Sequence, residues 1–186
     1  FGMWFLFPFY VADALGRGPA VLGVLLAAMS AAGFAGSAAG GRLADRAGDR
    51  RSAFGGAVLT AAGLACVGTL DGEAAVGMVG LCAAVVGFGF GFHQGAVYAL
   101  TMRATPDERA GAGSAMLAVT QTIGTVASIA ILTSVVAWRR AAVAPALPET
   151  EAFLAGYRYA YLLAAAVALA AGAVVAPFSL KRAQRG

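Results

Sequence analysis

Residues 41–51, GRLADRAGDRR, place six charged side chains between two long apolar stretches. The stretches at residues 19–39 and 53–70 contain no charged side chain. A helix that crosses the hydrocarbon core of a bilayer needs about 20 mostly apolar residues. The pattern therefore predicts two membrane-spanning helices joined by a short charged connection.

The same alternation continues along the whole chain. Apolar stretches lie at residues 1–15, 19–39, 53–70, 75–102, 114–138 and 159–178, followed by a tail at residues 179–186. The chain is 60% hydrophobic and 12% charged, about half the roughly 25% charge usual in soluble domains. This composition argues against a secreted disulfide domain, a disordered chain and a soluble enzyme. Because open strand edges are not tolerated in lipid, we predict an all-α membrane protein with six transmembrane helices, the first of them truncated.

The basic residues suggest an orientation. Nine of the 13 Lys and Arg fall on one side of the predicted membrane and four on the other. The positive-inside rule places the nine in the cytoplasm, together with both ends of the chain. Arg139, Arg140 and Arg158 oppose this assignment. Trp138 and Tyr157 lie at span ends and are expected at the membrane interface. Short basic clusters between apolar stretches do not indicate nucleic-acid binding.

The fourth apolar stretch contains the polar pair His93 and Gln94. Gly87, Gly91 and Gly95 recur every four residues, so this stripe predicts close packing against a neighbouring helix. An ionisable group inside the membrane usually faces a cavity or a partner, and histidine titrates near neutral pH. Three interpretations are open: a neutral His93 hydrogen-bonded between helices, contact with a substrate cavity, or proton coupling.

Polar side chains also share one face of the fifth stretch, where their spacing follows the helical repeat. They are Ser114, Gln121, Thr125 and Ser128. This face either lines a translocation path or joins helices by hydrogen bonds.

Aromatic residues supply the remaining candidates. Phe88, Phe90 and Phe92 either contact a substrate in the cavity or face lipid and packing partners. Tyr10 and Asp13, near the outer end of the first stretch, are expected at an outer vestibule, with proton transport by Asp13 as the alternative.

No chemical site is predicted elsewhere. Cys66 and Cys82 lie in apolar stretches without Cys-x-x-Cys spacing, so we expect them to pack as two small apolar side chains. Hydrolase, zinc-protease and P-loop motifs are absent from the sequence. We therefore expect no enzyme activity, no catalytic residue, no metal and no cofactor.

The charged stretch resembles the loop signature of the major facilitator superfamily, Gly-x-Leu-Ala-Asp-Arg-x-Gly-Arg-Arg/Lys, which joins helices two and three and, more loosely, eight and nine. The matching residues are Gly41, Leu43, Ala44, Asp45, Arg46, Gly48 and Arg50. Asp49 stands where the family usually has a basic residue.

Two further stretches resemble the fourteen-helix drug:proton antiporters of this superfamily. Residues 7–11, Phe-Pro-Phe-Tyr-Val, are similar to the entry into the second half of those proteins, and residues 106–111 to the segment before their penultimate helix. Gln121 and Gly124 continue that second match.

The resemblance implies the C-terminal six-helix half of a transporter, built from two inverted three-helix repeats and working by alternating access against a missing N-terminal half. It implies a gating role for Asp45, with Arg46 and Arg50 as its charged surroundings, and proton-coupled efflux of drugs or other amphipathic molecules. The expected partners are the lipid bilayer, a small-molecule substrate and protons. A chain with 12 Arg and one Lys, rich in Ala and Gly, suggests a bacterial cell membrane. The alternatives are a metabolite exporter or importer of the same superfamily, or a non-transporting membrane scaffold or receptor.

Overall fold

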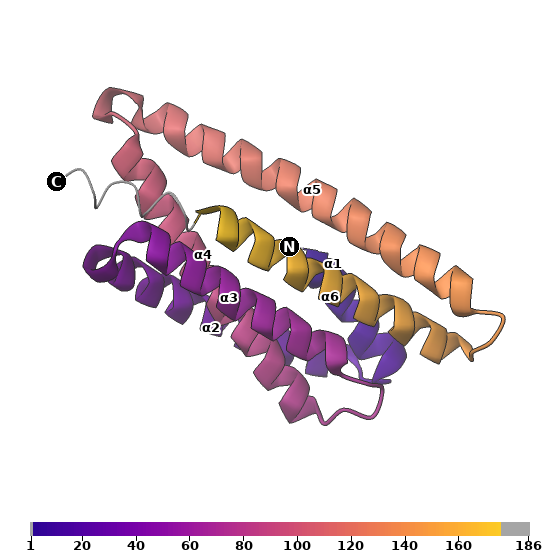
Figure 1. Ribbon diagram of the computed structural model, residues 1–186. Coiled ribbons are helices and arrows are strands. Elements are labelled where there is room, and N and C mark those ends of the chain that lie inside the picture. The colour runs from indigo at the N-terminus through magenta and orange to yellow at the C-terminus, as the bar shows by residue number, and fades with distance from the viewer. Residues whose placement is uncertain (1, 176–186) are drawn as a thin grey trace.

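The computed structural model describes residues 2–175, and within them every regular element is a helix (Figure 1). The elements are α1 (Gly2–Phe9), the π-helical η1 (Tyr10–Ala14), α2 (Pro19–Ala47), α3 (Asp49–Thr69), α4 (Val76–Ala104), the 3-10 turn η2 (Asp107–Arg109), α5 (Ala110–Val143) and α6 (Glu149–Val175). Phe1, the predicted end of the last span at residues 176–178 and the tail at residues 179–186 lie outside the described residues.

Five segments in the described part of the chain are long and apolar enough to cross a membrane. They are α2, α3, α4, the continuous segment Asp107–Val143, and Glu149–Val174 in α6. The predicted first span is helical across α1 and η1 but is shorter than this requirement. The prediction of an all-α membrane protein is confirmed.

The charged connection is a sharp turn rather than a loop. The sequence suggests a connection over residues 40–52, but α2 continues to Ala47 and α3 begins at Asp49. Gly48 alone separates them, with φ +92°, a conformation that glycine adopts at little cost. Its N–H donates to the Ala44 carbonyl at 3.0 Å and so closes the end of α2.

The connection between α5 and α6 is also shorter than predicted. Helix α5 continues to Val143 and α6 begins at Glu149, although the apolar stretches end at residue 138 and resume at residue 159. The Ala152 N–H donates to the Pro148 carbonyl at 2.9 Å, which starts the helix immediately after the proline. Glu149 and Glu151 lie in its first turn, where negative charge favours a helix.

A disulfide joins α3 to α4. The sulfurs of Cys66 and Cys82 are bonded, with a Cα–Cα distance of 5.8 Å. This corrects the expectation of two separate apolar side chains. A short connection makes α3 and α4 antiparallel neighbours, so residues near their shared end lie opposite each other although 16 positions separate them in sequence.

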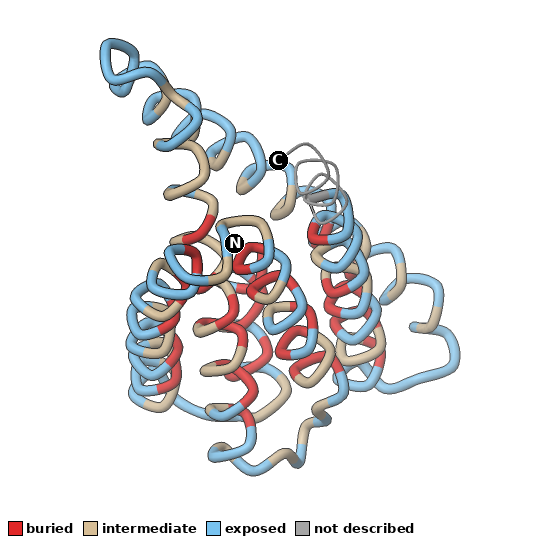
Figure 2. Tube along the Cα trace, turned by 60° about the vertical axis from the view of Figure 1, so that its left-hand side comes forward, coloured by how far each residue is buried: buried red, intermediate tan, exposed pale blue. Residues whose placement is uncertain are grey.

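Helix α4 packs against both α2 and α3, while α6 packs against α3 and α5. Buried residues line the inward sides of the packed helices (Figure 2). Helix α5 is the exception, because only Leu132 and Val136 are buried among its residues, all of which are described.

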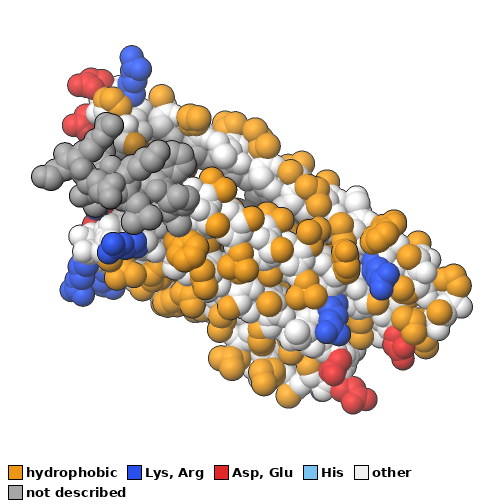
Figure 3. All heavy atoms as spheres, viewed as in Figure 1, with side chains coloured by type: hydrophobic (Ala, Val, Ile, Leu, Met, Phe, Trp, Pro, Cys, Tyr) orange, Lys and Arg blue, Asp and Glu red, His pale blue; other side chains and the backbone are white. Residues whose placement is uncertain are grey.

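The outside of the bundle is apolar. Hydrophobic side chains cover the visible face along the helices, and charged ones gather at the two ends (Figure 3). Phe34 is 82% exposed and Met116 is 73% exposed. In water such a surface would indicate an interface, whereas in a bilayer it faces lipid tails.

Candidate functional site

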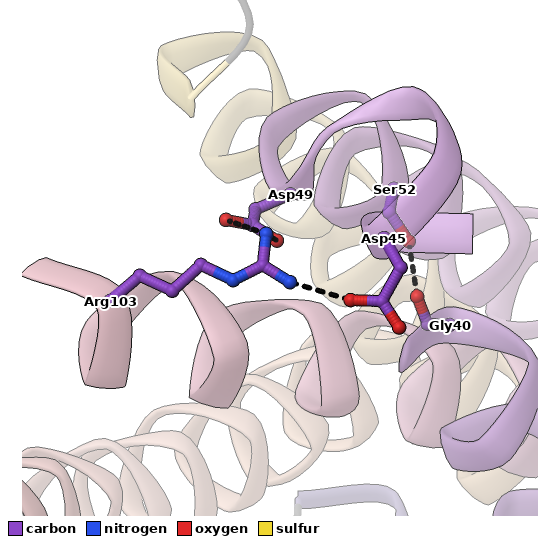
Figure 4. Close-up of polar contacts among 5 residues, drawn as sticks. All are labelled: Gly40, Asp45, Asp49, Ser52 and Arg103. Atoms are coloured by element: carbon purple, nitrogen blue, oxygen red, sulfur yellow. Dashed lines mark hydrogen bonds and ion pairs between the residues drawn. The ribbon is translucent and has the colours of Figure 1, made fainter. Parts of the chain in front are cut away.

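One arginine connects the ends of three helices at the charged turn. Arg103, near the end of α4, lies between Asp45 of α2 and Asp49 of α3 (Figure 4). Its Nη2 is 2.5 Å from Asp45 Oδ1, and its Nη1 is 3.1 Å from Asp49 Oδ1. Sequence reasoning missed Arg103 because it lies 58 residues from Asp45.

The two carboxylates differ in burial. The Asp45 side chain is 67% exposed, whereas that of Asp49 is 12% exposed. Exposed ion pairs contribute about 0–1 kcal/mol because water screens them. Asp49 is better shielded and also lies at the positive end of the α3 helix dipole. Asp49, which stands where the family signature usually has a basic residue, therefore provides the more protected contact to Arg103.

The turn itself is held by small residues. Ser52 Oγ is buried and donates to the Gly40 carbonyl at 2.9 Å (Figure 4). Ala44, Ala53 and Ala96 are buried together beside it, one from each of α2, α3 and α4. These contacts position the carboxylates against Arg103.

The rest of the predicted gating loop faces outward or is partly covered. Leu43 is 41% exposed, and Arg46 is also exposed. A side chain at Gly41 would meet nothing within 4 Å. Arg50 is half-buried.

His93 is hydrogen-bonded between helices. Its Nδ1 lies 3.0 Å from the Ala53 carbonyl oxygen of α3. Since a carbonyl only accepts, this contact requires the proton on Nδ1. The structure thus favours the interhelical role among the three interpretations of His93. Its neighbour Gln94 is half-buried.

The glycine stripe on α4 faces α2 at very short range. A Cβ built at Gly91 would lie 1.9 Å from the Gly33 carbonyl oxygen, and one at Gly87 would lie 2.1 Å from that of Met29. At Gly95 the nearest atom is the Ser37 carbonyl oxygen, at 2.7 Å. No side chain fits between these backbones.

A cavity of about 400 Å³ opens between α1, α3, α4, α5 and α6. Its lining is almost entirely apolar and contains no charged side chain. Thr60 and Ser128 supply the hydroxyl groups, and Trp4 and Phe90 supply aromatic surface. The cavity suits an apolar molecule with little hydrogen-bonding demand.

The predicted cavity residues are mostly elsewhere. Of the candidates His93, Gln94, Gln121, Thr125, Ser128, Phe88 and Phe92, only Ser128 lines this cavity. Phe92 is buried, with its ring centroid 6.0 Å from that of Phe88. Thr125 Oγ donates to the Gln121 carbonyl of its own helix at 2.8 Å. Phe90, the phenylalanine between Phe88 and Phe92, lines the cavity and forms its aromatic wall together with Trp4.

An aromatic stack occupies the predicted outer end of the bundle. The ring centroids of Tyr10 and Tyr157 are 4.8 Å apart, and those of Tyr157 and Tyr161 are 4.2 Å apart. Tyr10 Oη donates to the Asp71 carbonyl at 2.7 Å. Both Tyr10 and Tyr157 are fully buried, so Tyr10 does not face an outer vestibule, whereas the interfacial position of Tyr157 stays a prediction.

The other residues predicted near this end remain accessible. Asp13 is exposed, and its vestibule role stays a prediction. Trp138 is 60% exposed and packs edge to face on Tyr159 at 6.2 Å. Among residues 2–175, no group of three or more His, Cys, Asp or Glu is arranged to hold a metal ion.

The long apolar helices, their lipid-like exterior and the apolar cavity define a multi-pass membrane protein. The family description Major Facilitator Superfamily matches residues 1–185, so the chain belongs to this superfamily of membrane transporters. Its members are transporters rather than enzymes. No curated protein matches the chain.

Proposed function

We propose that this chain moves lipophilic or amphipathic small molecules out of a bacterial cell by alternating access, with proton flow as the energy source. The cavity carries the proposal. It lies among the membrane-spanning helices and is lined by apolar side chains with the Thr60 and Ser128 hydroxyls. A charged group would lose its hydration there without a counter-charge. We therefore expect the apolar part of a substrate, rather than a charged group, to occupy the cavity.

The contact between Arg103 and the two aspartates supports a transport gate at the end of the bundle that contains the charged turn. Pairing of Asp45 and Asp49 with Arg103 holds the ends of α2, α3 and α4 together. In the proposal this end is cytoplasmic, the six helices form two inverted repeats, and they work against a second six-helix unit. A cysteine at Ala47 labelled only from inside the cell supports this orientation, whereas labelling only from outside overturns it.

Proton coupling rests on the resemblance to drug:proton antiporters. No carboxylate lines the cavity within the described residues, and Nδ1 of His93 is engaged by Ala53. We therefore place the proton-carrying groups on the second six-helix unit rather than in this cavity.

The test places a larger side chain in the cavity at a position where its Cβ meets no neighbouring atom. Gly124 lines the cavity, and a Cβ there meets nothing within 4 Å. Gly124→Leu in the complete polypeptide should lower efflux of the lipophilic dye Hoechst 33342 by roughly tenfold, the equivalent of about 1.4 kcal/mol.

Gly111→Leu is the matched control, because Gly111 is on the same helix, has equally open space and lies outside the cavity. Equal efflux by both variants would overturn the cavity assignment. Movement of a polar metabolite without the dye would favour a metabolite exporter or importer. Absence of any solute or proton movement by the unmodified protein would favour a scaffold or receptor.

A further inference from the structure

A second pocket, of about 560 Å³, opens at the end of the bundle where α5 leads into α6. Its wall includes the end of α3 and the connection after it, the end of α5 and the start of α6. Leu147, Leu154 and Leu162 supply apolar surface. Figure 3 shows basic and acidic side chains among hydrophobic ones at this end.

Four charged side chains line this pocket, two of each sign. They are Arg139, Arg158, Asp71 and Glu151. The ion pairs of the described residues include none of the four. By contrast, the neighbouring Arg140 pairs with Glu149 outside the pocket lining.

The arginines are placed to receive a ligand. Arg158 is exposed, and the half-buried Arg139 has its guanidinium carbon 6.0 Å from the centroid of the Tyr159 ring. A guanidinium over an aromatic face keeps its N–H groups available at its edge. Of the acids, Asp71 Oδ1 accepts the Glu73 N–H at 3.1 Å, which leaves its second oxygen for other donors.

The pocket also lies at the depth expected for lipid headgroups. Trp138 and Tyr159, 60% and 50% exposed, pack edge to face beside it. Exposed Trp and Tyr at the ends of membrane helices mark the interface between hydrocarbon and water. Arg139 and Arg158 are among the arginines that the positive-inside rule does not explain.

We propose that this pocket binds the phosphate–ammonium zwitterion of a phosphatidylethanolamine headgroup. Arg139 and Arg158 take the phosphate, because the guanidinium fork matches phosphate oxygens. Asp71 and Glu151 accept N–H bonds from the primary ammonium, and the leucines contact the first carbons of the acyl chains. A purely anionic headgroup meets two uncompensated carboxylates, and a choline headgroup has no N–H to donate.

Native mass spectrometry of the purified, delipidated protein tests this. We expect phosphatidylethanolamine to bind about tenfold more tightly than phosphatidylglycerol or phosphatidylcholine, a factor equivalent to about 1.4 kcal/mol. Arg139→Gln with Arg158→Gln should abolish this preference. Asp71→Asn with Glu151→Gln should bring phosphatidylethanolamine down to the level of phosphatidylglycerol.

Arg17→Gln is the charge-matched control for Arg158→Gln alone, because each removes one positive charge and Arg17 is exposed at the same end of the bundle but lies outside the pocket. Arg158→Gln alone serves if the double variant fails to fold, and it should weaken the preference. Unchanged binding by the arginine variants, or equal weakening by Arg17→Gln, overturns the site. Displacement of the lipid by equimolar free phosphoethanolamine would assign the pocket to a soluble zwitterion and overturn the lipid assignment.

Discussion

Replacing Gly91 by alanine tests whether α2 and α4 are held by direct backbone contact. The added Cβ would lie 1.9 Å from the Gly33 carbonyl oxygen and 2.7 Å from its carbonyl carbon. Both atoms belong to the backbone, so no side-chain rotation relieves the overlap. Helix α2 must instead move away by about 1.5 Å to restore ordinary contact distances.

The expected cost follows from a comparison with Gly23→Ala on α2. A Cβ at Gly23 meets nothing within 4 Å, so this control gains only the helix propensity of alanine, about 1 kcal/mol. Gly91→Ala has the same gain but adds overpacking, which costs about 1–3 kcal/mol. The propensity term cancels in the difference, which leaves Gly91→Ala less stable than the control by about 1–3 kcal/mol.

Reversible unfolding in mixed detergent–SDS micelles, followed by circular dichroism, measures this difference. Both variants are compared with the unmodified protein under one set of micelle conditions. A Gly91→Ala protein as stable as Gly23→Ala would refute the close approach of α2 and α4. The glycine stripe would then be a consequence of composition rather than of packing.

Asp49→Asn should lower the free energy of unfolding more than Asp45→Asn, by about 1 kcal/mol, since Asp49 is better shielded; equal losses would contradict this. Asp45→Asn should lower transport with expression intact, and full activity would remove its gating role. His93→Ala should cost about 0.5–1.5 kcal/mol through the lost Ala53 hydrogen bond, while the pH–transport curve stays unchanged; a shifted curve would instead support proton coupling. Maleimide should add no mass at Cys66 and Cys82 until a reductant is present, and two adducts without reductant would exclude the disulfide.

The helices could be predicted from sequence because lipid leaves the backbone few alternatives. Their ends could not, because a charged residue past the bilayer edge is compatible with either a loop or a continued helix. Residues 41–47 are charged and yet helical, since Gly48 alone provides the reversal of direction. Pro148 similarly defines the start of α6 more sharply than the apolar pattern does.

The candidate site was harder to predict because it depends on helix rotation. Phe88, Phe90 and Phe92 look equivalent in sequence, but only Phe90 lines the cavity. A signal for the aromatic stack was present: Phe153, Tyr157 and Tyr161 recur every four residues and therefore share one face of α6. Burial of that face against Tyr10 depends on η1, which no local pattern on α6 specifies.

The two walls of the cavity differ in how firmly they are held. Gly87 on α4 lines the cavity and also contacts the Met29 backbone of α2, so moving this wall separates a close-packed pair of helices. Gly124 and Ser128 line it from α5, which has only Leu132 and Val136 buried along its length. Segments with few buried contacts open at the lowest free energy. We therefore expect the cavity to change size by movement of α5 rather than by separation of α2 from α4.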